Sequence, residues 1–147
     1  MVTRTARTAW DGGLKEGSGQ VELTSSGLAT FDVSFPKRAA EEANGSTSPE
    51  ELVAAAHSSC FSMSLAGLLE KAGTPPQSLD VTADVSVGYA DDGSFGLTGI
   101  VLTVRAEVEG VDDAAFQEAA ETAKANCPIS KALTGVAISL DASLESA

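Results

Sequence analysis

A long stretch without a charged side chain lies near the middle of the chain and restricts the folds open to it. No Lys, Arg, Asp or Glu occurs between Leu52 and Leu69. Local signals indicate that this stretch is helical, because Ser48 can cap a helix, Pro49 suits the first turn and Glu51 completes a capping box. Gly73, which is soon followed by two prolines, is typical of a helix end. We therefore predict one long helix that begins at Pro49 and ends just before Gly73.

The apolar residues of this helix point in nearly every direction around its axis. A helix of that kind has to be buried, and at this length it has to be covered by sheets or by another subunit. Small side chains allow other elements to approach closely, and they occur at Ala54, Ala55, Ala56, Ser58, Ser59 and Gly67. Contact with a second subunit is therefore a reasonable expectation.

Strand patterns flank the long helix on both sides. Alternating apolar residues and turn signals predict strands at 3–10, 19–23, 28–35, 79–89, 95–108 and 136–144. A second helix is expected from Asp112 to Asn126, and the polar stretch from Pro36 to Thr47 is expected to be a surface loop. The order βββ-α-ββ-α-β indicates an α+β fold with antiparallel sheets around long central helices. With 147 residues and no repeat or linker, the chain is expected to be a single domain, residues 1–147.

The charge balance excludes some classes of partner. Nine basic and twenty-one acidic side chains give a formal net charge of −12 at pH 7. This excess repels phosphate backbones and anionic lipids, so neither nucleic acid nor a membrane is expected as a partner. The N-terminus lacks the apolar core of a secretory signal, and no later run reaches about 18 uninterrupted apolar residues. We expect a cytoplasmic protein.

Two cysteines, Cys60 and Cys127, are the residues most able to carry chemistry. In a reducing compartment, cysteines are more often free, catalytic or redox-active than joined in a structural disulfide. Cys60 lies within the apolar helix, where a cysteine is usually an inert side chain with a raised pKa. Cys127 precedes Pro128, which suits a first helical turn, so backbone N–H groups there would favour its thiolate. The residues alone leave a reactive and a spectator role open for each.

Segments around both cysteines and at the start of the long helix form a distinctive combination. They are Ser48-Pro49-Glu50-Glu51-Leu52, the stretch from Ala54 through His57-Ser58-Ser59-Cys60-Phe61-Ser62-Met63, and Cys127-Pro128-Ile129-Ser130-Lys131-Ala132-Leu133. Trp10-Asp11-Gly12 and the terminal Ile138-Ser139-Leu140-Asp141 fit the same pattern. Together these segments resemble the OsmC/Ohr family of organic hydroperoxide peroxidases, and in particular its OsmC branch. The resemblance covers nearly the whole chain.

The resemblance implies an OsmC-like fold, an intertwined homodimer and active sites at the dimer interface. Carried onto this sequence, the peroxidatic cysteine is Cys60, the resolving cysteine is Cys127 and the site glutamate is Glu50. The arginine is assigned to Arg38, with Lys37 as the alternative cation because the loop around them is slightly longer than is typical.

The activity that the resemblance implies is thiol-dependent peroxidase chemistry in defence against oxidative or osmotic stress. Organic hydroperoxides, and H₂O₂ more weakly, would be reduced to alcohols through a sulfenic acid on Cys60 and then a Cys60–Cys127 disulfide. A small or protein-bound dithiol of the lipoyl type would be the reductant. No cofactor is implied, and two cysteines and one histidine without a CxxC or HExxH pattern predict no metal.

Helix geometry separates Glu50 from Cys60. Ten residues of regular helix correspond to about 15 Å along the axis. We therefore expect Glu50 to serve Cys60 of the other subunit, or to reach its own site only through an intervening arginine. His57 faces nearly the same side of the helix as Cys60, but a packed histidine is commoner than a base, and a thiolate stabilised by an arginine needs none.

Local physics and the resemblance differ on which thiol attacks first. The helix-end position favours a thiolate at Cys127, whereas the resemblance assigns the first attack to Cys60. We follow the resemblance, because an arginine outweighs a helix-end effect of about 0.3–1 kcal/mol.

Two other functions are compatible with the same fold. The first is a non-catalytic stress or ligand-binding protein, against which the presence of both cysteines argues. The second is a redox sensor or thiol oxidoreductase acting on protein disulfides, for which a CxxC motif would have been expected.

Overall fold

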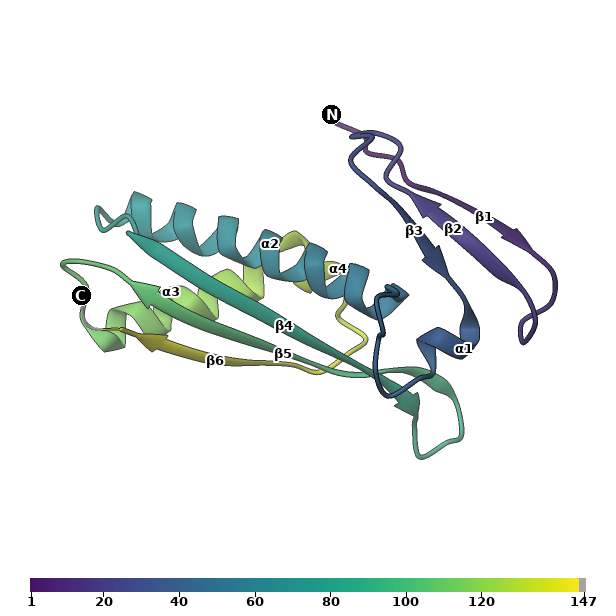
Figure 1. Cartoon of the computed structure of the whole chain (residues 1–147). Coiled ribbons are helices and arrows are strands. Elements are labelled where there is room, and N and C mark those ends of the chain that lie inside the picture. Colours follow the sequence, from purple (N-terminus) through teal and green to yellow (C-terminus); the bar gives the residue numbers. More distant parts are fainter. Residues whose placement is uncertain (146–147) are drawn as a thin grey trace. The chain divides into compact units, whose positions relative to one another are not determined.

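The computed structural model describes residues 1–145 and shows mixed helices and strands (Figure 1). The chain divides into two compact units, Met1–Leu52 and a second that begins at Val53. The α+β class is confirmed, whereas the single domain stays a prediction. The elements are β1 Arg7–Asp11, β2 Ser18–Glu22, β3 Thr30–Val33, α1 Phe35–Arg38, α2 Pro49–Lys71, β4 Ser78–Tyr89, β5 Phe95–Glu107, α3 Asp113–Asn126, α4 Pro128–Ala132 and β6 Ile138–Leu144.

The first unit contains a three-stranded antiparallel sheet in the order β1-β2-β3, as predicted. The prediction of a loop from Pro36 to Thr47 is corrected at its start, because the first residues of this stretch belong to the short helix α1. Ser34 caps α1 by accepting a hydrogen bond from the Lys37 N–H at 3.4 Å, and Pro36 occupies the first turn, where its fixed φ suits a helix. This cap and proline explain the helical turn that the polar composition concealed.

The cap of α2 agrees with the local signals in the sequence. The N–H of Glu51 donates to the Ser48 hydroxyl at 3.1 Å. In a capping box the glutamate would accept a second bond from the backbone N–H of Ser48. Here the Glu51 carboxylate instead accepts from the Thr47 hydroxyl at 2.6 Å. The helix ends at Lys71, and Gly73 follows with a φ of +87°, a conformation that favours glycine.

Burial divides α2 into two faces, although its composition is apolar all round. His57, Phe61, Leu65 and Leu69 repeat at intervals of four residues and are buried. The opposite face is exposed in the single chain, and Met63 there is 70% accessible. The other exposed positions on α2 include Ala55, Ala56, Ser59 and Gly67. The sequence predicted burial on nearly every side of this helix, and the single chain buries one face of it.

By length and composition alone, α2 is apolar enough to cross a membrane, with a mean hydropathy of 1.5. A core helix of a soluble protein meets the same criterion. The face of α2 that contains Phe61, Leu65 and Leu69 belongs to the core of the second unit, as expected for a core helix.

The second unit contains a three-stranded sheet in the order β4-β5-β6. The long antiparallel hairpin of β4 and β5 was predicted, and a bulge between Ser86 and Val87 shifts its register. Strand β6 pairs with β5 in parallel, with Leu102 opposite Leu140, so this sheet is mixed rather than antiparallel. The reason is the helical crossover through α3 and α4, which lets the following strand run in the same direction.

The core of the second unit lies on one face of this sheet. Alternate residues of β5 point toward the helices, and α2 and α3 both contribute to the cluster, so the two helices cover the same face. The buried members are Phe61, Leu65, Leu69, Leu102, Val104, Ala106, Phe116, Ala120 and Ala123.

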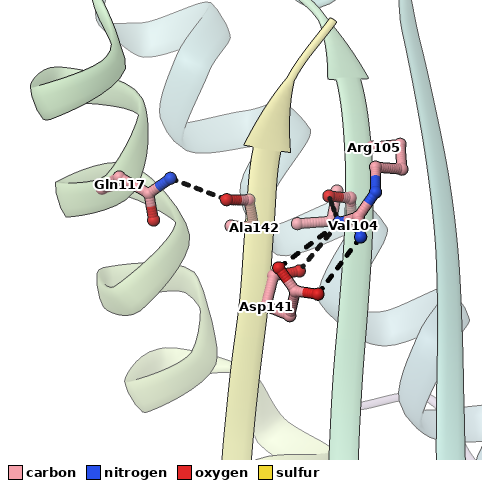
Figure 2. A network of polar contacts seen from close by, with 5 residues as sticks. All are labelled: Val104, Arg105, Gln117, Asp141 and Ala142. Carbon is pink, nitrogen blue, oxygen red and sulfur yellow. Dashed lines mark hydrogen bonds and ion pairs between the residues drawn. The ribbon is translucent and has the colours of Figure 1, made fainter.

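Polar contacts fasten β6 to its neighbours on both sides (Figure 2). The Gln117 side chain of α3 donates to the Ala142 carbonyl at 2.7 Å. The Arg105 guanidinium of β5 pairs with the Asp141 carboxylate at 3.1 Å and donates to the Val104 carbonyl at 3.0 Å. These contacts support the crossover that also places α4.

Candidate active site

The structure brings the two cysteines together from distant parts of the sequence. Cys60 lies on α2, and Cys127 lies between α3 and α4, where it ends one helix and begins the next. Both are free thiols, and each is close enough to shift the pKa of the other. Cys127 is fully buried, whereas Cys60 is half-buried. Two free thiols in contact are the arrangement required for reversible disulfide formation.

The surroundings of Cys60 disfavour its thiolate. Burial, the largest influence, raises the pKa of Cys60, and the hydrogen bond and charge of Cys127 act in the same direction. Hydrogen bonds from the Ile129 backbone and the Ser64 side chain act against this rise without overcoming it. Cys60 therefore needs a further positive charge to become a strong nucleophile at neutral pH.

The surroundings of Cys127 act in the opposite direction. Burial is again the largest single influence and works to raise the pKa of Cys127. Hydrogen bonds from the Ser130 backbone, the Cys60 thiol, the Ser130 hydroxyl and the Ile129 backbone together hold that pKa below its ordinary value. Within this pair the negative charge is therefore favoured on Cys127, in line with its position before Pro128.

His57 is the buried polar neighbour of this pair. Its Nε2 lies 2.8 Å from the hydroxyl oxygen of Ser130, and both side chains are buried. Burial lowers the pKa of His57, so the ring is neutral near pH 7. Its Nδ1 has no hydrogen-bond partner among the described residues. The ring thus contacts Ser130, and no hydrogen bond joins it to Cys60 among the described residues.

The first unit contains a charged pair of its own. Arg38, at the end of α1, donates from Nη2 to Glu50 Oε1 at 2.6 Å and from Nε to Oε2 at 3.1 Å. The contact is a two-pronged ion pair in which 9% of the Glu50 side chain and 31% of the Arg38 side chain are exposed. Lys37, the alternative cation, is exposed. The structure therefore pairs Arg38 with Glu50, the glutamate that the resemblance assigned to the site.

Both pKa values in this ion pair move away from neutrality. The hydrogen bond and negative charge of Glu50 raise the pKa of Arg38 against the opposing effect of burial. Burial works to raise the pKa of Glu50, but the bond and charge of Arg38, with hydrogen bonds from its own backbone N–H and from Ser48, hold it below its ordinary value. Glu50 is therefore ionised throughout the neutral range.

An apolar pocket of about 450 Å³ adjoins this ion pair within the first unit. Arg38 supplies its charged edge, and most of the other lining residues are apolar. A hydrophobic cavity with one convergent charge is a common form of ligand site. Its principal apolar residues are Trp10, Leu14, Val21, Val33, Phe35 and Leu52.

The resemblance assigned four of the residues described above to the site, Cys60, Cys127, Arg38 and Glu50, and it assigned no role to two serines. Ser130 contacts both His57 and Cys127, and Ser64 contacts Cys60. A signal for Ser130 was present, because a serine three residues after a helix-capping position can reach back to it. Among residues 1–145, no three His, Cys, Asp or Glu side chains gather in a way that could hold a metal ion.

Comparisons with known proteins agree with this fold. The family model described as "OsmC-like protein" matches residues 42–141. The chain is 39% identical over 145 residues to the protein named peroxiredoxin OsmC of Escherichia coli strain K12, covering 99% of each. It is 33% identical over 106 residues to the organic hydroperoxide resistance protein of Xanthomonas axonopodis pv. citri strain 306, covering 70% of each.

A solved structure extends the similarity to three dimensions. The crystal structure of the organic hydroperoxide resistance protein OhrB of Bacillus subtilis has a TM-score of 0.73 and 29% identity, covering 95% of this chain and 98% of that one. Because the family model spans more than half of the chain and a relative aligns along nearly all of it, this chain belongs to the OsmC family.

Proposed function

We propose that this chain is a thiol-dependent peroxidase that reduces organic hydroperoxides to alcohols, and H₂O₂ more weakly. The observation that carries the proposal is the contact between the free thiols of Cys60 and Cys127 in a member of the OsmC family. The names of the relatives, peroxiredoxin and organic hydroperoxide resistance protein, support the same class of reaction.

The first step is attack by the Cys60 thiolate on the distal peroxide oxygen. An S–O bond forms and the O–O bond breaks, and the leaving alkoxide takes a proton to become an alcohol. Cys60 is thereby oxidised to a sulfenic acid. Because burial raises the pKa of Cys60, this step needs a cation beside the thiol.

We assign that cation to Arg38, held by Glu50 through their two-pronged ion pair. Glu50 lies ten residues before Cys60 on α2, or about 15 Å along a regular helix, so it acts through the guanidinium. Whether the pair serves Cys60 of its own chain or of a second copy is a separate question that mixed dimers of Arg38 and Cys60 variants would decide.

The second step closes the catalytic disulfide. The Cys127 thiolate attacks the Cys60 sulfur, the S–S bond forms, and the S–O bond breaks to release hydroxide, which takes a proton to become water. The favoured charge on Cys127 suits this role as resolving thiolate. A dithiol of the lipoyl type then supplies two electrons by exchange and is itself oxidised to a disulfide.

We further propose a cytoplasmic homodimer that acts in oxidative or osmotic stress. The exposed face of α2, which carries small residues and Met63, is suited to close contact with a second copy. The net charge of −12 makes nucleic acid and anionic membranes poor partners. A monomeric mass by light scattering at micromolar concentration would contradict the dimer.

The test is consumption of cumene hydroperoxide and of H₂O₂ by the reduced protein with dihydrolipoamide. The Cys60→Ser variant should lose at least about a thousandfold in organic-peroxide turnover, because it lacks the nucleophile. The Cys127→Ser variant should react once and hold a sulfenic acid on Cys60 that dimedone traps. No turnover by folded, reduced wild-type protein would instead indicate a binding protein or a redox sensor.

A further inference from the structure

The buried contact between His57 and Ser130 has no role in the steps above. The two residues come from α2 and α4, and their side chains meet at 2.8 Å inside the second unit. His57 is fully buried, yet its Nδ1 has no hydrogen-bond partner among the described residues. A buried unpaired polar atom lowers stability, so an apolar side chain would ordinarily fit this position better. The contact therefore calls for a reason other than packing.

The contact continues from Ser130 to the cysteine pair. Ser130 lies three residues after Cys127, in the first turn of the helix that Cys127 precedes, and its hydroxyl is among the groups that lower the pKa of the Cys127 thiol. A serine hydroxyl has one hydrogen to donate and two lone pairs to accept. When the Ser130 hydrogen points to Cys127, the Ser130 oxygen is left to accept a hydrogen from His57 Nε2.

The tautomer of His57 follows from this count. With its hydrogen on Nε2, the ring donates to Ser130 and leaves Nδ1 as a bare acceptor. With its hydrogen on Nδ1, the ring would bury an unpaired N–H and would take the Ser130 hydrogen away from Cys127. The first arrangement satisfies more groups, and it requires the neutral ring that burial already favours.

We propose that His57 is a positioning residue that, through Ser130, directs a hydroxyl hydrogen onto Cys127 and makes Cys127 the sulfur that leaves when the Cys60–Cys127 disulfide is reduced. This rests on the proposed function, and it adds an order of events to it.

Accessibility and leaving-group strength both point to the same order. Cys60 is half-buried and Cys127 is fully buried, so an incoming thiolate reaches Cys60 more easily. In thiol–disulfide exchange, the sulfur that is better stabilised as a thiolate leaves faster. The reducing dithiol therefore attacks the Cys60 sulfur, an S–S bond forms between them, and the protein disulfide breaks with its electron pair on Cys127.

The second exchange completes the reduction. The second thiolate of the dithiol attacks the dithiol's other sulfur, which is bonded to Cys60 in the mixed disulfide. The new S–S bond closes within the dithiol, and the Cys60 thiolate is released. The dithiol has then lost two electrons and become a cyclic disulfide, and its two protons go to the solvent or to the protein thiols. The protein has gained the two electrons and is ready for another peroxide.

The first measurement needs no peroxide. The ionisation of Cys127 is followed against pH in a Cys60→Ser background, by the ultraviolet absorbance of its thiolate, which needs no reagent to reach this buried side chain. Ser130→Ala and His57→Leu should each shift the midpoint to higher pH, and together they should shift it no further than Ser130→Ala alone. His57→Gln, which keeps a donor near the position of Nε2, should restore the wild-type midpoint.

Ser64→Ala is the matched control, because Ser64 contacts the other thiol. It should leave the Cys127 midpoint in place. Circular dichroism confirms that each variant is folded. Unchanged Cys127 midpoints in folded Ser130→Ala and His57→Leu proteins would overturn the proposal.

The second measurement tests which sulfur is attacked. Oxidised protein is treated with a monothiol, 2-mercaptoethanol, quenched in acid and mapped for the mixed disulfide. The adduct should lie on Cys60, and disulfide cleavage in Ser130→Ala should be slower than in wild-type protein, because a leaving thiol with a higher pKa leaves more slowly. An adduct mainly on Cys127 would contradict the assigned order. If the Cys127 midpoints shift but the wild-type protein shows no peroxidase turnover, the positioning role of His57 stands and the proposed function is rejected. If turnover is seen but the midpoints do not shift, the proposed function stands and the positioning role is rejected.

Discussion

Residues 1–52 and residues 53–145 order their reactive groups by different means. In the first unit, Gly17 and Glu50 are the buried residues, and the side chains of the three-stranded sheet are exposed or half-buried. In the second unit, a cluster of aliphatic and aromatic side chains is packed between α2, α3 and β5. The thiols of Cys60 and Cys127 belong to the second unit, which has a packed core, and the guanidinium of Arg38 belongs to the first unit, which has few buried side chains.

This difference indicates what each part of the site requires. Cys60 and Cys127 meet because apolar burial fixes the helices that carry them, and no partner is needed for that. Arg38 is held by an ion pair whose arginine is partly exposed, and such pairs contribute modestly to stability. The first unit therefore needs a further surface to cover its apolar side chains, and a second copy of the chain is the candidate that we propose.

The largest expected effect tests the contrast in packing. Phe61→Ala removes a fully buried ring from the core and should lower the free energy of unfolding by about 3–5 kcal/mol in urea titrations. Phe31→Ala makes the same change at a half-buried position of β3 and should lower it by about 1–2 kcal/mol. Equal losses would show that another surface buries Phe31 in solution, and a dependence on protein concentration would identify a second copy.

A charge on the exposed face of α2 tests the proposed partner. Met63→Asp should weaken dimerisation by about a hundredfold or more, because a dimer interface there would bury an unpaired carboxylate. Val101→Asp is the control, since Val101 is an exposed apolar residue on the opposite face of the second sheet. Analytical ultracentrifugation measures both variants, and equal dimer affinities would locate the interface elsewhere.

The course of α2 could be predicted closely because its signals are local. Ser48 and Gly73 mark its ends, and neither depends on distant parts of the chain. The direction of β6 could not be predicted in the same way. Pairing between β5 and β6 is set by the crossover and by the cluster beneath it, and the alternating pattern of a strand carries no information on its neighbour's direction.

The site shows the same division between local and distant information. The position of Cys127 before Pro128 predicted a favoured thiolate, and the groups that surround Cys127 in the structure hold its pKa below the ordinary value. The contact between His57 and Ser130 joins residues 73 positions apart, and neither residue carries a local sign of the other. The resemblance to a family proposed Arg38 and Glu50, but composition and spacing would not have paired them.

A smaller effect is expected from the cation of the first unit. Arg38→Met should lower kcat/KM for cumene hydroperoxide at pH 7 by about 10- to 100-fold, because a nearby positive charge lowers a thiol pKa by about 1–3 units. Part of the loss should return as the pH is raised and Cys60 ionises without help. Lys37→Met removes the exposed neighbouring charge and should change kcat/KM little. If Arg38→Met and Lys37→Met lower kcat/KM by similar factors, Arg38 is not the specific cation of the site.

The smallest expected effect is a pH dependence of stability in the packed unit. Burial holds the pKa of His57 below its ordinary value of 6.5, so near and below that pH the unfolded chain binds a proton that the folded chain does not. Stability should therefore fall as the pH drops below about 6.5, by at most about 1.4 kcal/mol per pH unit.

The chain suits this measurement because it has a single histidine. Carboxylates such as Glu50, whose pKa is held below 4.5, contribute their loss of stability only at lower pH. Urea titrations between pH 7 and pH 5, at one protein concentration, should show the slope in wild-type protein and a flatter line in His57→Gln. A slope that persists in His57→Gln would assign it to another group, and it would mean that burial does not keep His57 neutral in the folded chain.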